Sequence, residues 1–223
     1  MLNLNKSLFR IVFIWVFLAM TGLARAGSYT DFFRAISIDD VDAVKALLAQ
    51  GFDPNAVDAK GNSALTLALR DGSLKVAHVL LNAPGLHPDT ENAAGETPLM
   101  IACLRGDTAL AKELVSHGAA LDRPGWTPLS YAATNGHLDI VQFLLANGAR
   151  PDAPAPNGTT PLMMASYFGH LDCVKALLAA HANPQLRNDQ GYRAIDLAIK
   201  QGHDDVRAVL AAAMGDSRPK GSW

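Results

Sequence analysis

Apolar and small residues recur along this chain in short runs that have the spacing of one helix face. The clearest run lies in residues 125–152, GWTPLSYAATNGHLDIVQFLLANGARPD. Thr127 stands where a helix N-cap is favoured, and Pro128 stands in the first turn, where a missing N–H costs nothing. A helix is therefore predicted to begin at about Pro128. It should end near Gly136, because glycine suits the left-handed conformation that follows a helix.

A second helix is predicted directly after the first. Residues 137–146 carry apolar side chains at helical spacing, and Gly148 ends the run. The two helices form a hairpin with apolar residues on both broad sides. One such pair cannot bury both sides alone, so we expect it to stack between copies of itself.

The same pattern returns at a regular interval. The residues that open the first helix are separated by 34, 30, 33 and 33 positions, and they are Leu65, Leu99, Leu129, Leu162 and Ile195. A segment further upstream fits a first copy that lacks the Thr-Pro pair. We therefore predict six repeats, over about 28–57, 58–90, 91–124, 125–154, 155–187 and 188–214. The short spacing of 30 predicts a truncated hairpin tip at residues 123–126.

Segment 125–152 closely resembles the ankyrin repeat, whose signature is Gly, Thr-Pro-Leu, an alanine pair, Gly-His, Val-x-x-Leu-Leu and a closing Gly-Ala. The resemblance covers the chain from about 28 to 214, with a period close to the 33 residues of that family. It implies an all-α fold, a solenoid of about six helix-turn-helix repeats with short hairpin tips.

One position departs from the ankyrin pattern in every repeat. The histidine that usually follows Thr-Pro-Leu is replaced by Thr66, Met100, Ser130, Met163 and Asp196. In the family this histidine makes hydrogen bonds between repeats. We expect Thr66 and Ser130 to supply substitutes and the two methionines not to.

Residues 1–26 have the pattern of a secretory signal peptide. Lys6 and Arg10 precede an apolar run over 11–23, and Ala24-Arg25-Ala26 has the form of a cleavage site. A membrane anchor is the alternative, but this run is shorter than the ~20 residues that a spanning helix needs. We expect cleavage after Ala26, no stable membrane anchor afterwards, and export to the bacterial periplasm or outside the cell. Residues 215–223 lack periodicity and are expected to be disordered.

Charge and cysteine content exclude several classes. Removal of residues 1–26 takes three of the 19 basic residues and none of the 21 acidic ones, which leaves 16 − 21 = −5. An acidic domain binds nucleic acid poorly, so no nucleic-acid partner is expected. Cys103 and Cys173 fall on helices two repeats apart, beyond the ~7 Å Cα separation that a disulfide allows. We predict two free, buried thiols.

The recurring histidines do not predict a metal site or an enzyme. His137, His170 and His203 would lie about 10 Å apart in a stack of helices, whereas zinc ligands reach one ion at about 2 Å. They match the Gly-His positions that are structural in ankyrin repeats. Because Ser130 lacks a G-x-S-x-G motif and no phosphate-binding glycine loop occurs, we expect neither enzymatic activity nor a cofactor.

A protein-binding module is the remaining interpretation. The resemblance implies contacts through the hairpin tips and the exposed side of each first helix, positions that include Asn62 and Thr159. Interface hot spots are rich in Trp and Tyr. We therefore predict a protein-binding surface formed by Trp126, Tyr167, Phe168 and Tyr192 together with Arg105, Asn135 and Lys200. The alternative is that Trp126 folds over the short tip and Phe168 packs between helices, which would leave no continuous patch.

Two roles follow for such a module, and the partner is an unidentified protein in both. The chain is expected to be a monomeric adaptor or scaffold for a periplasmic or secreted protein. Alternatively, it is an inhibitor or immunity-type protein that blocks a secreted enzyme or toxin. Asn157-Gly158-Thr159 is a glycosylation sequon and would be modified in a eukaryotic secretory route.

Overall fold

The structure is a computed structural model that describes residues 29–215. The predicted signal peptide and the residues after Gly215 lie outside this range. The chain divides between Leu86 and His87 into two compact units. Within residues 29–215 all regular elements are helices apart from a single β-bridge between Val57 and Ser63, so the predicted all-α fold is confirmed.

The first unit contains two helical pairs. Its aromatic and aliphatic core includes Phe32, Ile36, Val44 and Leu80, which are all fully buried. Apolar burial of this kind is the main source of stability for short helices that are marginal in isolation. The helices are residues 29–37, α2 (Val41–Ala49), α3 (Ala64–Asp71) and α4 (Leu74–Leu81).

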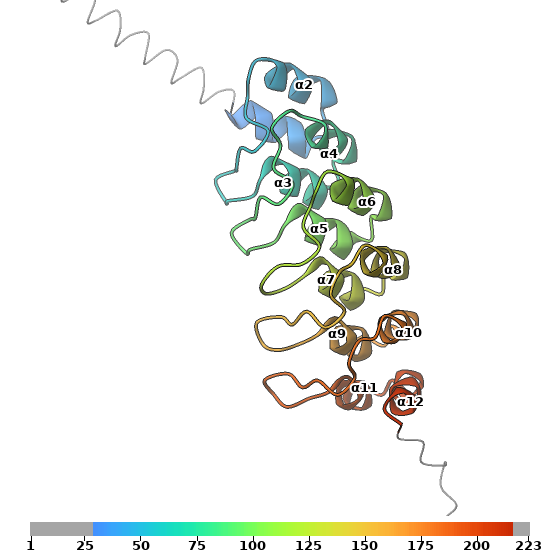
Figure 1. Cartoon of the computed structure of the whole chain (residues 1–223). Coiled ribbons are helices and arrows are strands. Elements are labelled where there is room, and N and C mark those ends of the chain that lie inside the picture. Colours follow the sequence, from blue (N-terminus) through green and yellow to red (C-terminus); the bar gives the residue numbers. More distant parts are fainter. Residues whose placement is uncertain (1–28, 216–223) are drawn as a thin grey trace, which may run out of the picture. The chain divides into compact units, whose positions relative to one another are not determined.

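The second unit contains four helical pairs that stack in sequence order (Figure 1). The helices are α5 (Pro98–Arg105), α6 (Thr108–Ser116), α7 (Pro128–Thr134), α8 (Leu138–Ala146), α9 (Pro161–Tyr167), α10 (Leu171–Ala179), α11 (Ala194–Gln201) and α12 (Asp204–Ala213). The first helices of the pairs, α5, α7, α9 and α11, pack side by side, and α6, α8, α10 and α12 form a second row.

The Thr-Pro pairs start helices as predicted. The hydroxyl oxygens of Thr97, Thr127 and Thr160 accept hydrogen bonds from the third backbone N–H of α5, α7 and α9, at 3.2–3.4 Å. These caps satisfy donors that a helix N-terminus otherwise leaves unpaired. Helix α7 begins at Pro128, and Gly136 follows its C-cap with a φ of 72°. Both predicted ends of this helix are confirmed.

The expectation that Thr66 and Ser130 replace the inter-repeat bonds of the missing histidine is wrong, because the hydrogen bonds at this position stay within its own repeat. The sulfur atoms of Met100 and Met163 accept the backbone N–H of Thr97 and Thr160 at 3.4 and 3.5 Å, so the methionines complete the cap. The hydroxyl of Ser130 bonds the Thr127 hydroxyl of its own repeat, and Thr66 does the same with Ser63. The reason is positional: the residue lies at the third helical position, from which its side chain reaches back to the N-cap.

Histidines join neighbouring repeats of the second unit. The Nε2 atoms of His137, His170 and His203 lie 3.2, 2.9 and 3.1 Å from the carbonyl oxygens of Leu104, Thr134 and Tyr167. A carbonyl oxygen only accepts, so each Nε2 carries the proton and donates it. The structural role predicted for these histidines is confirmed.

Each of these rings also lies against a glycine of the preceding repeat. An added Cβ on Gly136 would lie 2.5 Å from Nδ1 of His170, and one on Gly169 would lie 2.6 Å from the His203 ring. The glycine is therefore required twice, for its left-handed φ and for the space that the imidazole occupies.

The first unit uses a different connection. Asp39 has a φ of 56°, and its carboxylate accepts the backbone N–H of Val76 on α4 at 2.9 Å. Ser73, the N-cap of α4, makes no capping bond of its own. The carboxylate of the earlier helical pair therefore caps the second helix of the later pair.

Both cysteines are free and buried, as predicted. Burial raises the pKa of the Cys103 thiol well above its ordinary value. Burial, followed by the nearby Asp172 carboxylate, raises the pKa of Cys173 to about 11. Both side chains therefore behave as small apolar groups in the core.

Candidate protein-binding surface

The four predicted aromatic residues fall into three groups. Trp126 meets the Tyr131 ring edge-on, with ring centroids 6.4 Å apart. Tyr167 and Phe168 meet at 4.9 Å, and Tyr192 lies under the ammonium group of Lys200 at 5.2 Å. Among residues 29–215 no ring contact joins the three groups.

The alternative to a binding surface was that Trp126 folds over the short tip and Phe168 packs between helices, and the structure bears on both residues. Phe168 is 46% exposed and stacks against the His170 ring at 6.3 Å, so it does not pack between helices. Trp126 is half-buried, because its ring lies against Tyr131 of its own repeat. Tyr167 is exposed and Tyr192 is half-buried.

The short hairpin tip that precedes Trp126 is present where it was predicted. Residues 124–126 form bends and lack the turn that the tips at 93–94, 156–157 and 189–190 contain. The guanidinium of Arg123 donates to the Gly95 carbonyl and pairs with the Glu91 carboxylate of the preceding repeat. This clamp fixes the chain three residues before Trp126.

Trp126 and Tyr131 line an apolar hollow that the sequence analysis did not predict. We call it the Trp126 hollow; its volume is about 210 Å³, and its lining is Leu104, Trp126, Tyr131, Thr134 and Met164. The lining comes from α5, α7 and α9 and from the loop before α7. Tyr131 and Met164 were missed. The available signal was that each lies two residues after the leucine that opens its helix, at one shared repeat position.

The hydroxyl groups of the hollow are bonded inside the protein. Tyr131 donates its hydroxyl hydrogen to Glu96 at 3.0 Å, and Thr134 donates to the Ser130 carbonyl at 2.7 Å. Burial, together with the Glu96 carboxylate, raises the pKa of Tyr131 to about 12. The tyrosine is therefore neutral near neutral pH and presents its ring, not a charge, to the hollow.

The polar residues of the predicted surface lie beside these groups. Asn135 donates its side-chain amide to the Leu104 carbonyl at 3.1 Å, so it supports one wall of the Trp126 hollow. Arg105 follows Leu104 and ends α5, with an exposed side chain. Lys200 belongs to the Tyr192 group at the end of α11. The structure thus brings Trp126, Arg105 and Asn135 to one region of the first-helix row.

Two residues expected at exposed positions are buried. Asn62 is 4% exposed, and its backbone N–H and side-chain amide donate to the Asp58 carboxylate at 2.8 and 2.9 Å. Burial alone would raise the pKa of Asp58, but hydrogen bonds from Asn62 and Lys60 lower it overall. Thr159 is 6% exposed, and its N–H donates to Asn157 at 3.1 Å. Each expectation was wrong because the residue closes its hairpin tip from inside.

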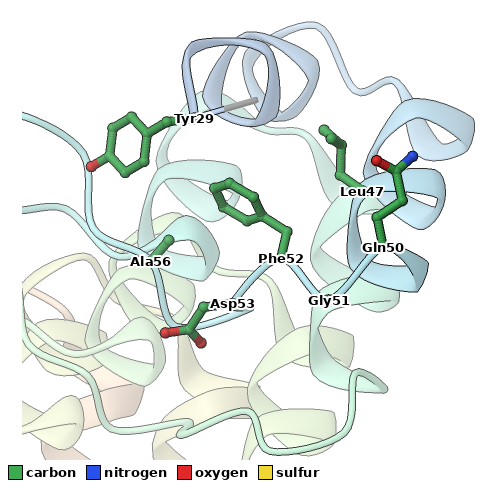
Figure 2. Close-up of a pocket in the computed structure, with 7 residues that line it drawn as sticks. All are labelled: Tyr29, Leu47, Gln50, Gly51, Phe52, Asp53 and Ala56. Atoms are coloured by element: carbon green, nitrogen blue, oxygen red, sulfur yellow. The ribbon is translucent and has the colours of Figure 1, made fainter. Parts of the chain in front are cut away.

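The first unit has a larger hollow, of about 460 Å³, near the start of the described chain (Figure 2). In Figure 2 the Phe52 ring lies between Tyr29 and Leu47, and Asp53 and Gln50 supply polar groups at its margin. Phe52 also packs on Phe32 at 4.3 Å between ring centroids. The sequence analysis placed no site here.

Two other features, a cluster of metal ligands and a membrane-spanning helix, are absent from the described part of the chain. No group of three or more His, Cys, Asp or Glu side chains in residues 29–215 is arranged to hold a metal ion. None of the helices in this range is long and apolar enough to cross a membrane.

Paired helices in stacked rows, with glycine-ended helices and projecting tips, define a class of helical repeat proteins. Comparison with known proteins places the chain within that class. A family model described as ankyrin repeats (3 copies) matches residues 84–155 and 147–218, and one described as ankyrin repeats (many copies) matches 32–81. The chain belongs to the ankyrin-repeat family, whose members are protein–protein interaction modules.

Individual relatives are similar over part of their length. The I-Kappa-B like protein C2 of Microplitis demolitor bracovirus is 34% identical over 88 residues, which is 39% of this chain and 49% of that protein. The E3 ubiquitin-protein ligase XB3 of Oryza sativa is 39% identical over 87 residues, 37% of this chain and 19% of the ligase. The chain thus matches about half or less of the length of these curated relatives.

A solved structure extends the similarity to most of the fold. The crystal structure of an ankyrin repeat domain from Acinetobacter baumannii has a TM-score of 0.73 and 29% sequence identity. The match covers 82% of this chain and 97% of the other.

Proposed function

We propose that this chain is an exported, non-enzymatic adaptor that binds a periplasmic or secreted protein through its hairpin tips and its row of first helices. The family supports binding of a protein. The observation that carries the proposal is the group of apolar and aromatic side chains on α5, α7 and α9, where Leu104, Tyr167 and Phe168 are 37–46% exposed. Large apolar side chains exposed on neighbouring helices favour a contact surface.

Export is the second component, and it rests on the pattern of residues 1–26. The chain should be expressed in a bacterium with a C-terminal tag, and the N-terminus of the exported form should be sequenced. The expected sequence begins at Gly27. An Ala24→Asp/Ala26→Asp variant should block cleavage, because peptidase sites need small residues at these positions. Wild-type chain that stays in the cytoplasm with residues 1–26 attached would refute export.

Partner binding is tested by affinity capture from the exported fraction. Wild-type chain should retain one protein at a fixed ratio. The Trp126→Ala variant and the Tyr167→Ala/Phe168→Ala variant should each lose most of it, because large aromatic side chains contribute most to interface energy. Equal recovery by both variants would discard the aromatic surface. If the captured protein is an enzyme or toxin whose activity falls when the chain binds, the adaptor role is replaced by inhibition.

A further inference from the structure

We infer that the Trp126 hollow binds a peptide segment of the partner by enclosing one uncharged apolar side chain, of the size of leucine, methionine or phenylalanine. This inference rests on the proposed function and names the chemistry of its central contact. Trp126 meets Tyr131 of its own repeat, and Leu104 and Met164 of the adjacent repeats complete the lining of the hollow.

The volume of the hollow limits its occupant. At about 210 Å³ it is below the ~300–1,000 Å³ of pockets that enclose drug-sized ligands. A single large side chain is the group of appropriate size. Leu104 lines the hollow and is 40% exposed, so the hollow is open to an approaching chain.

The chemistry of the lining excludes a charged occupant. All five lining side chains are uncharged, and the hydroxyl hydrogens of Tyr131 and Thr134 are already donated inside the protein. The Glu96 carboxylate, which is bonded to Tyr131, also accepts from the Asn92 amide. A carboxylate or ammonium group entering here would lose its hydration without gaining a partner, which is strongly unfavourable.

One polar group of the hollow favours a peptide over a plain hydrocarbon. The indole N–H of Trp126 has no acceptor within residues 29–215. This N–H is open to solvent in the free chain, and the backbone carbonyl next to an inserted side chain would supply an acceptor when the hollow is occupied. The partner segment can then continue along α9, because Tyr167 and Phe168 follow Met164 by three and four residues on the same helix face.

The inference is tested on the full chain by nuclear magnetic resonance of its indole N–H signals. The probes are the N-acetyl methylamides of leucine, phenylalanine, glycine, lysine and aspartate. The chain has three tryptophans, so a Trp126→Phe variant assigns the Trp126 signal. The leucine and phenylalanine probes should shift this signal with dissociation constants on the order of millimolar, as expected for ligands of this size. The other three probes should not shift it.

A matched pair of variants distinguishes the effect of a charge inside the hollow from the effect of a charge elsewhere on the surface. Leu104→Glu and Ile199→Glu place the same charge on exposed aliphatic positions of α5 and α11, but only Leu104 lines the hollow. Leu104→Glu should weaken binding of the leucine probe at least about tenfold, and Ile199→Glu should leave its dissociation constant unchanged. Thermal unfolding confirms that both variants are folded. An equal response of both variants, or a shift of the Trp126 signal by the lysine probe, overturns the inference.

The same variants distinguish failure of the hollow from failure of the proposed function. If wild-type chain captures a partner and Leu104→Glu captures it equally well, the hollow inference is wrong and the adaptor function stands. If wild-type chain captures nothing, the adaptor function is wrong, and the probe titration still decides whether the hollow binds apolar side chains. Sedimentation velocity tests whether a second copy of the chain occupies the hollow. If the wild-type chain forms dimers and Leu104→Glu abolishes them, the occupant is a second copy, and the inference of a partner peptide is overturned.

Discussion

At the junction that precedes the second helix of a pair, Asp39 of the first unit and His170 of the second unit connect neighbouring repeats in opposite directions. Asp39 of the earlier pair accepts an N–H from α4 of the later pair. His170, by contrast, belongs to the later repeat and donates to the Thr134 carbonyl of the earlier one. The first arrangement satisfies a donor at a helix N-terminus, and the second satisfies an acceptor at a helix C-terminus.

Each type of connection depends on a pair of residues, so converting one type into the other requires two substitutions. A histidine needs a glycine beneath it, because a Cβ at Gly136 would overlap the imidazole. In the first unit a small residue, Ser73, occupies the N-cap of α4, and Asp39 carries a Cβ at a left-handed φ. We therefore expect a substitution of one member of a pair to lower the free energy of unfolding, and a matching substitution of the other member to restore part of it.

The largest expected effect is that of Gly136→Ala in the second unit. The alanine would adopt a φ of 72° and also overlap the His170 ring, so we expect a loss of about 3 kcal/mol in the free energy of unfolding. Urea denaturation measures it. The matched control is Gly148→Ala, where φ is 94° but no atom lies within 4 Å, and a loss of about 1 kcal/mol is expected.

A double-mutant cycle completes this test. His170→Ala removes the overlapping ring, so the combination with Gly136→Ala should cost less than the two single losses added together. Strict additivity would show that the imidazole does not occupy the space above Gly136.

The next effect is expected for Ser73→His in the first unit. The new imidazole would need the space that the Asp39 side chain fills, so we expect a loss of about 2 kcal/mol. Adding Asp39→Gly should recover most of that loss, because it recreates the glycine–histidine pair of the second unit. Failure of the double variant to recover stability would mean that backbone geometry, not this pair, separates the two connections.

A smaller effect is expected for Asp39→Ala. It removes the acceptor for the Val76 N–H and places alanine at a φ of 56°, which together should cost about 1.5 kcal/mol. Asp39→Asn keeps both an acceptor oxygen and the tolerance for this φ, and should cost less than half as much. Thermal or urea unfolding of the two variants separates them, and equal losses would argue against the hydrogen bond.

The smallest effect concerns acid stability in the last repeat. Hydrogen bonds from Arg193 lower the pKa of Asp196 below its ordinary 3.8, although burial opposes them. A carboxylate with a lowered pKa in the folded state stabilises the protein above pH 3.8, and this contribution disappears as pH falls through the folded value. Asp196→Asn should therefore reduce the stability lost on moving from neutral pH to about pH 3, by less than ~1 kcal/mol.

Urea unfolding at the two pH values measures this difference. Met163 provides the internal comparison, because it occupies the same repeat position as Asp196, caps its helix with sulfur and carries no charge. The Met163→Leu variant should lose the same stability on acidification as wild type. An unchanged acid sensitivity of Asp196→Asn would show that Arg193 does not stabilise the charged form.

Local sequence patterns predicted most of the helical architecture. The caps at Thr97, Thr127 and Thr160 and the glycines after each first helix act within a few residues, so they can be identified without coordinates. The period of the repeat then followed from the spacing of the residues that open each first helix. Asn62 and Thr159 were misplaced because exposure was inferred from repeat position alone, while their hydrogen bonds close the tips from inside.

The candidate site was less accessible to sequence reasoning. Trp126, Arg105 and Asn135 were recognised, but Tyr131 and Met164 were not, because their role depends on which side chains of neighbouring repeats they meet. Such packing joins residues of neighbouring repeats, and the shared repeat position of Tyr131 and Met164 was the only mark of it in the sequence.

The sequence by itself determined the type of the helices and where those with Thr-Pro caps and closing glycines begin and end, because caps and periodicity are short-range properties of the chain. The structural role of the histidines followed from the resemblance to ankyrin repeats. Only the tertiary structure decided that Asp39 and His170 connect repeats in opposite directions, that Met100 and Met163 cap helices through sulfur, and that an apolar hollow opens beside Trp126. Those outcomes depend on which atoms of neighbouring repeats meet, and this is set by packing.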